Sequence, residues 1–206
     1  MKFIFKIVIL FFGFNSILSA QTYQERFNTL DVQHYKLQLE VNDTTNVIKA
    51  TMDVLIKFKK SVTSFDLDLV TKDSTEMGLQ VDSIYQNNIV VAFNQKNNKL
   101  TIEPQHVFPS LPYTYKIKYS GIPKDGLVIS NNIFGDRTFF GDNWPNRAHN
   151  WFPCIDHPSD KATIEYIINA PNHYQVIANG FQVEETNLTN NLKQYHWKTM
   201  LLYQQK

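Results

Sequence analysis

YKLQLEV, residues 35–41, alternates apolar and polar side chains without a break. Successive side chains of an extended strand point to opposite faces, so this alternation predicts a strand with one buried face and one solvent-facing face. The same period of two recurs over residues 52–58, 65–69 and 113–119. No apolar stripe with helical spacing runs for more than two turns, and the chain is therefore expected to be all-β.

Shorter apolar and β-branched runs fill the intervals between these strands. They cover residues 79–85, 89–93, 99–103, 163–168, 174–178 and 194–198. Turn residues separate them, and the runs 89–93 and 99–103 are close enough to form a hairpin. Residues 121–132 contain Gly, Pro and Asn and are expected to form a loop. Many short strands at this spacing predict a sandwich or a saddle-shaped pair of sheets.

The first 20 residues have the order of a secretory signal peptide. Lys2 and Lys6 precede an apolar run over residues 7–18, and the small residues Ser19 and Ala20 suit a cleavage site. A membrane anchor is the competing interpretation, but about a dozen residues make a helix too short for a hydrocarbon core of roughly 30 Å. The chain is therefore expected to be exported, to a periplasm, a cell surface or the medium. Residues 21–32 then form a polar lead-in segment.

The charged residues and the single cysteine exclude several kinds of binding partner and an internal disulfide. Lys and Arg number 20 against 19 Asp and Glu, with no basic stripe, so neither nucleic acid nor an anionic membrane is expected as a partner. No segment after the signal peptide is apolar enough to cross a bilayer. Cys154 is the only cysteine, which excludes an intramolecular disulfide.

The chain lacks the usual motifs of hydrolytic sites. None of its six histidines is followed by Glu, so the zinc-binding pattern His-Glu-x-x-His is absent, and no Gly-x-Ser-x-Gly occurs. His149, Cys154, Asp156 and His157 are a candidate metal cluster, and Cys154 with His149 or His157 is a candidate nucleophile pair. A buried, inert Cys154 beside hydrogen-bonded imidazoles is the favoured alternative.

Asp156, Asp160 and Lys161 also have two interpretations. They are either substrate contacts or a local scaffold in which Lys161 pairs with an aspartate and Ser159 or Asp160 caps a turn. The scaffold is favoured.

Residues 132–158 differ from the rest of the chain. They are dense in Trp, Phe, Pro, Asn, Asp and His without a clean period, as is typical of a structured loop that carries function. From residue 142 to residue 163, the sequence resembles the end of the amino-terminal domain of aminopeptidase N-like zinc metallopeptidases, the gluzincin aminopeptidases. The matching residues are Ala148, Phe152-Pro153-Cys154, Asp156-His157-Pro158 and Lys161-Ala162-Thr163.

Weaker similarity extends the resemblance to residues 33–198. His34-Tyr35, Tyr119-Ser120-Gly121 and residues 176–180 are also similar to the family, whereas His149 stands where many members have Arg. The resemblance implies a saddle-like antiparallel β-sandwich that caps the cleft of a catalytic domain following it in the chain. It also implies zinc and a peptide substrate for the full-length enzyme.

The family's catalytic motifs have no counterpart in these 206 residues. No catalytic residue and no metal ligand is therefore expected in this chain, which is predicted to be inactive alone, and residues 199–206 form a divergent or truncated tail. A stand-alone exported β-sandwich that binds another molecule, and a non-catalytic relative of the family, remain the alternatives.

One substrate contact remains possible within this domain. In the family, a loop just before Phe-Pro-Cys contributes to the pocket for the substrate's free amine and first residue. The resemblance places that loop at Asp142, Asn143 and Trp144. Asp142 is suited to accept hydrogen bonds from an ammonium group and Trp144 to form an apolar wall. Alternatively, Trp144 and Trp151 are packing anchors of the loop.

Overall fold

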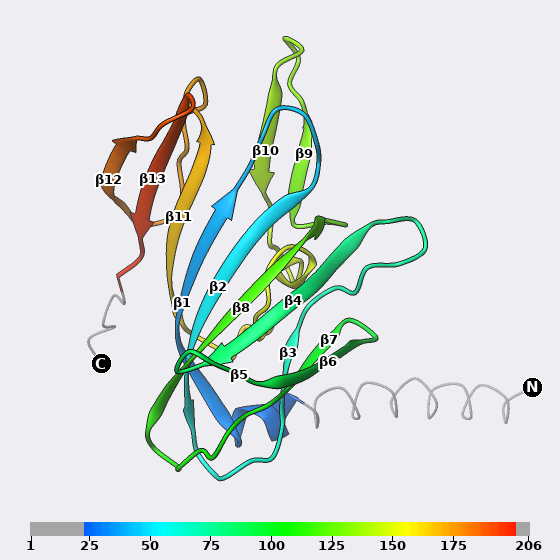
Figure 1. Cartoon of the computed structure of the whole chain (residues 1–206), viewed down its shortest axis with the longest axis vertical. Coiled ribbons are helices and arrows are strands. Elements are labelled where there is room, and N and C mark those ends of the chain that lie inside the picture. The colour runs from blue at the N-terminus through cyan, green and yellow to red at the C-terminus, as the bar shows by residue number, and fades with distance from the viewer. Residues whose placement is uncertain (1–22, 201–206) are drawn as a thin grey trace, which may run out of the picture.

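A twisted sheet of eight strands forms one layer of the molecule (Figure 1). The computed structural model describes residues 23–200. Spatial order across the sheet is β12-β13-β11-β1-β2-β8-β4-β5. Its strands are β1 (Leu30–Glu40), β2 (Ile48–Phe58), β4 (Gly78–Gln86), β5 (Ile89–Val90), β8 (Pro112–Ile122), β11 (Thr163–Pro171), β12 (Phe181–Asn187) and β13 (Leu192–Lys198).

Smaller elements make up the second layer. A three-stranded sheet has the order β3-β7-β6, and a separate hairpin pairs β9 with β10. Their bounds are β3 (Phe65–Asp68), β6 (Ala92–Lys96), β7 (Lys99–Glu103), β9 (Leu127–Asn131) and β10 (Arg137–Gly141). A short 3-10 turn, η1 (Ala148–Asn150), lies in the loop that leads to β11.

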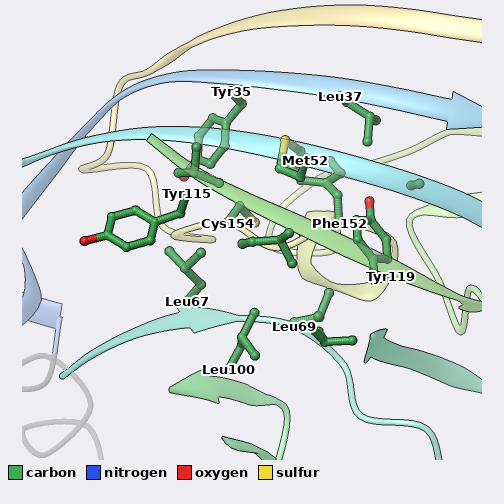
Figure 2. Close-up of a cluster of buried hydrophobic side chains, with 14 of the residues drawn as sticks. Tyr35, Leu37, Met52, Leu67, Leu69, Leu100, Tyr115, Tyr119, Phe152 and Cys154 are labelled. Atoms are coloured by element: carbon green, nitrogen blue, oxygen red, sulfur yellow. The ribbon is translucent and has the colours of Figure 1, made fainter. Parts of the chain in front are cut away.

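The core lies between the large sheet and the smaller elements. Leu37 and Met52 point inward from the large sheet and are fully buried, as the alternation predicts. Leu67 and Leu100 approach from the three-stranded sheet, and Cys154 fills the space between (Figure 2). The fold is therefore an all-β sandwich, and this prediction is confirmed.

One strand pair departs from the antiparallel expectation. β1 and β11 run parallel, with Lys36 opposite Glu165 and Leu37 opposite Tyr166. All other pairings between named strands of residues 23–200 are antiparallel. Strands joined by a tight turn must be antiparallel, whereas β11 reaches β1 only after a long connection through the second layer, which permits the parallel arrangement.

Several local predictions need correction. Residues 174–178 are not a strand, because they line a cavity instead of pairing with a neighbour. The loop predicted for residues 121–132 contains β9. Residues 89–93 divide at Val91, so that β5 pairs with β4 and β6 forms the hairpin with β7. β12 was not predicted, since its side chains are exposed and show no apolar alternation.

The predicted ends fall partly outside the described residues. The signal peptide of residues 1–20 and most of the tail, residues 201–206, lie there. Within the lead-in segment, residues 23–27 are helical and β1 already begins at Leu30. Between residues 23 and 200 no helix is long and apolar enough to cross a membrane.

Candidate functional site

The loop that follows β10 is fastened to β3 by backbone hydrogen bonds. Asp68 and Cys154 exchange two of them, at 2.7 and 3.1 Å, and Val70 N–H donates to the carbonyl of His149 at 2.8 Å. Trp151 and Phe152 are buried and pack edge to face, with ring centroids 4.7 Å apart. The loop is therefore part of the second layer and has a fixed position over the core.

Asp68 is the centre of a polar network beneath this loop. Both of its carboxylate oxygens accept hydrogen bonds from Arg26, each at 2.9 Å. The backbone N–H of Asp156 also donates to Asp68, at 3.1 Å. The Asp156 carboxylate in turn lies 2.6 Å from Nδ1 of His149, and this hydrogen bond raises the pKa of the imidazole. Asp156 and His149 therefore hold each other and the loop in place.

Asp160 is anchored by a tyrosine rather than by a lysine. The hydroxyl of Tyr35 donates to Asp160 Oδ2 at 3.2 Å and accepts from the N–H of Ile155 at 3.0 Å. Burial raises the pKa of Asp160 to about 6. The predicted pairing of Lys161 with an aspartate is absent from the ion pairs formed within residues 23–200. Geometry thus supports the scaffold interpretation through different contacts.

Cys154 does not have the surroundings of a nucleophile. Its side chain is buried, and desolvation, followed by the nearby carboxylates, raises the thiol pKa well above its ordinary value. A reactive thiolate needs a cationic, accessible environment. The thiol is a small apolar filler of the core.

The candidate metal cluster does not assemble around one point. His149 contacts Asp156, but His157 bonds Ser159 at 2.7 Å and stacks on Tyr23 at a centroid distance of 4.3 Å. Over the described range 23–200, no three His, Cys, Asp or Glu side chains are grouped to hold a metal ion.

The predicted substrate loop directly follows the C-terminal end of β10, and the N–H of Asp142 donates to the carbonyl of Gly126 at 2.7 Å. Asp142 Oδ2 forms an ion pair with Nη1 of Arg147 at 2.9 Å. Asn143 Oδ1 accepts a hydrogen bond from the indole N–H of Trp151 at 2.8 Å. Trp144 is 81% exposed. Of the two tryptophans, only Trp151 is therefore a packing anchor, while Trp144 is presented to solvent.

Asp125, from the connection between β8 and β9, lies beside this loop, although nothing in the sequence pattern indicated it. Its carboxylate lies 3.5 Å from Nε of Arg147, so that one guanidinium faces two carboxylates. Gly126 permits this approach: it has φ +75°, and a Cβ there would lie 2.3 Å from the carbonyl oxygen of Arg147. Asp125, Asp142 and Arg147 together carry a net charge of −1, which suits the binding of a cation.

Comparison with protein families gives one match, to the peptidase M1 N-terminal domain, over residues 31–202. The chain belongs to this family. The loop and the two-layer β fold described above are thus those of an M1 N-terminal domain. Comparison with curated proteins found no match.

Solved structures similar to this M1 N-terminal domain include an M1 zinc metallopeptidase from Deinococcus radiodurans. It is 24% identical, with a TM-score of 0.68, and the match covers 83% of this chain and 39% of that one. A point mutant of a two-domain M1 zinc metallopeptidase bound to L-tryptophan is 23% identical over the same shares, with a TM-score of 0.70. These likenesses show a shared fold, and the chain spans only about two fifths of the length of either structure.

A third structure is a mutant of the Deinococcus radiodurans M1 zinc metallopeptidase bound to the substrate Tyr-Ser-Ala. Its identity is 23% and its TM-score 0.67, and the match covers 82% of this chain and 39% of that one.

Proposed function

We propose that this M1 N-terminal domain caps the cleft of an exported zinc aminopeptidase that removes N-terminal residues from peptides. The observation that carries the proposal is the match of the chain to only 39% of two-domain zinc metallopeptidases. Similar structures are described with L-arginine, L-tryptophan or the substrate Tyr-Ser-Ala bound. A second domain that carries the chemistry is therefore the expected partner.

Asp142, Asn143 and Trp144 are the proposed contribution of the cap to substrate binding. The net charge of −1 on the Asp125, Arg147 and Asp142 cluster attracts the free α-ammonium group of a peptide. Trp144, with its ring in solvent, offers an aromatic wall to the first side chain. Asn143 fixes the loop through its bond to Trp151. Holding the amine at one position aligns the first peptide bond with the catalytic groups of the partner domain.

Zinc in such an enzyme would polarise the peptide bond and activate water. The residues described here do not suit it, since His149 and Asp156 are committed to each other and to the network around Asp68. We therefore assign no zinc ligand and no catalytic residue to this domain, and derive no chemical step from it.

The β9–β10 turn is a proposed contact to the catalytic domain. Ile133 and Phe134 at its tip are 92% and 82% exposed, and two bulky apolar side chains at one exposed turn favour a protein partner. Export, the other part of the proposal, is supported by the order of residues 1–20.

Two measurements test the proposed function. Translation of the gene past the codon for Lys206, in all frames, should reveal Gly-x-Met-Glu-Asn and His-Glu-x-x-His. The purified 206-residue chain should contain no stoichiometric zinc by elemental analysis and should release no amino acid from unblocked peptides. Zinc-dependent release by that chain would refute the proposal.

A stand-alone binding module predicts a different result. That alternative requires a soluble monomer and a gene without the two downstream motifs. Size-exclusion chromatography with light scattering measures whether the chain is a monomer. A domain separated from its partner should instead associate, because its apolar side chains are exposed.

A further inference from the structure

A cavity of about 490 Å³ lies between the large sheet and the β9–β10 hairpin. β1 and β11 form its floor, β10 forms one wall, and the unpaired segment of residues 174–179 forms another. Its volume falls within the range of roughly 300–1,000 Å³ that small-molecule sites occupy. The apolar lining includes Leu39, Val41, Phe139, Tyr166, Ile168 and Val176.

Contacts outside the cavity hold its walls in place. The hydroxyl of Tyr174 donates to Asp43 at 2.7 Å, and the Tyr174 carbonyl accepts from Tyr195 at 2.6 Å. Phe139 packs edge-on against Tyr174, with centroids 5.6 Å apart. The segment without strand pairing is thereby fixed to β10, to β13 and to the β1–β2 turn, so the cavity is formed before any ligand enters.

Among residues 23–200, Arg137 is the only charged residue that lines this cavity. Its Nη2 donates to the carbonyl of Thr45 and to Asn46 Oδ1, both at 2.6 Å. Its Nε is buried without a hydrogen-bond partner within residues 23–200, and none of the ion pairs formed within that range includes Arg137. A partly buried guanidinium without a carboxylate partner favours an anionic ligand.

We propose that this cavity binds an apolar molecule that carries a single carboxylate. The carboxylate accepts hydrogen bonds from Arg137, and the apolar body lies against Leu39, Ile168 and Val176. One cation within apolar walls matches one negative charge better than the two charges of a phosphate monoester. Asn143 and Trp151 of the Asp142 loop also line the cavity. The two sites differ in charge, because the net charge around Asp142 is negative and the expected ligand group there is an ammonium.

Two kinds of molecule share this chemistry: a medium-chain fatty acid, and a peptide that ends in an apolar residue with a free carboxylate. Decanoate and N-acetyl-Leu-Phe serve as probes of the two sources. Decanol and N-acetyl-Leu-Phe-amide serve as their uncharged counterparts. Titration calorimetry of the 206-residue chain with each of the four compounds measures the preference for the acid without any mutation.

We expect at least one acid to bind roughly ten- to a hundredfold more tightly than its neutral counterpart. Arg137→Gln should abolish this preference, Arg137→Lys should keep part of it, and Val176→Trp should weaken acid and neutral compound alike by filling the cavity. Lys96→Gln is the control, because it removes one positive charge from the exposed edge of β6, outside the cavity, and should leave the preference unchanged.

The acid that binds identifies the source, whether decanoate, the peptide or both. Absence of binding by both acids to the unmodified chain would overturn the proposal, as would an equal preference in the Arg137→Gln and Lys96→Gln variants. Neither result decides the proposed aminopeptidase role, which is tested separately by the effect of Asp142→Asn on KM in the enzyme that includes the partner domain.

Discussion

The guanidinium of Arg26 faces both carboxylate oxygens of Asp68, with Nη1–Oδ1 and Nη2–Oδ2 distances of 2.9 Å. This pair joins the helical turn before β1 to the last residue of β3, and Asp68 also receives the N–H of Asp156. Three segments that are far apart in the sequence therefore depend on one carboxylate.

Replacement of Arg26 by alanine should lower the free energy of unfolding by about 3 kcal/mol, because it leaves a largely buried carboxylate unpaired. Urea denaturation followed by tryptophan fluorescence measures this loss. Lys72→Ala, which breaks the exposed pair with Glu76, is the control and should cost less than about 1 kcal/mol. Equal losses in the two variants would show that the Arg26 pair has no special role.

Gly121 should tolerate no side chain. Its φ is +147°, and a Cβ would lie 2.2 Å from the carbonyl oxygen of Gly78 on the neighbouring strand. Gly121→Ala is expected to destabilise the domain by roughly 2–4 kcal/mol, through backbone strain and displacement of β4 from β8. Gly141→Ala, with open space around its Cβ, should change the midpoint of thermal unfolding little. A similar midpoint for both variants would contradict the strand contact seen here.

Asp160 should make stability fall as the pH rises. Its folded-state pKa of about 6 lies above its ordinary value of 3.8, so the folded state binds the proton more tightly than the unfolded state. The resulting stabilisation is complete below pH 3.8 and is lost through pH 6. Relative to Asp160→Asn, the unmodified chain should lose about 2 kcal/mol between pH 4 and pH 7.

Asp73 provides a comparison of opposite sign. Hydrogen bonds from Lys124 and Thr75 lower the pKa of its carboxyl to about 2, so its contribution is present above pH 3.8 and is lost as the pH falls through 2. The pH dependence of unfolding for Asp73→Asn should therefore diverge from the unmodified chain only in acid. If the unfolding free energies of Asp160→Asn and the unmodified chain change in parallel from pH 4 to 7, the raised pKa of Asp160 would be contradicted.

Cys154 should react with thiol reagents only after unfolding. Its side chain is buried, and desolvation keeps the thiol protonated. Labelling with a disulfide reagent should be slow in buffer, and its rate should rise with urea in step with the unfolding transition. Rapid labelling of the folded chain would show that the Cys154 thiol is accessible and reactive.

Asp142 is tested in the enzyme that includes the catalytic domain. Asp142→Asn should raise KM for unblocked peptides roughly tenfold, because a charge-assisted hydrogen bond to the ammonium group is weakened. Asp125→Asn is the matched control: it removes the other carboxylate beside Arg147 and should raise KM less. Unchanged KM and kcat in Asp142→Asn would remove this residue from the site.

Strand identity was predictable where one face is buried. β1, β2 and β8 each bury alternate side chains, and the alternation in the sequence follows directly from this. β12 has no buried face and so leaves no such pattern. Residues 174–178 show the opposite case: they are apolar because they line a cavity, and sequence alone does not distinguish this from a strand face.

The long-range contacts of the site were not predictable from one sequence. The Trp, Phe and Pro residues of the loop marked it as unusual, and its resemblance to M1 enzymes placed Asp142 and Trp144. Asp125, which shares Arg147 with Asp142, comes from another segment of the chain. Such tertiary contacts have no local periodicity in the sequence.

The parallel pairing of β1 with β11 also determines when, during synthesis of the chain, the large sheet can be completed. β1 is complete at Glu40, but its second neighbour begins only at Thr163, more than a hundred residues later. At roughly 5–20 residues per second, a ribosome would leave that edge uncovered for about 6–25 s. Lys36, Gln38 and Glu40 along the strand discourage another chain from pairing there during that interval. The sheet is therefore completed only when β11, from the last quarter of the chain, reaches its place beside β1.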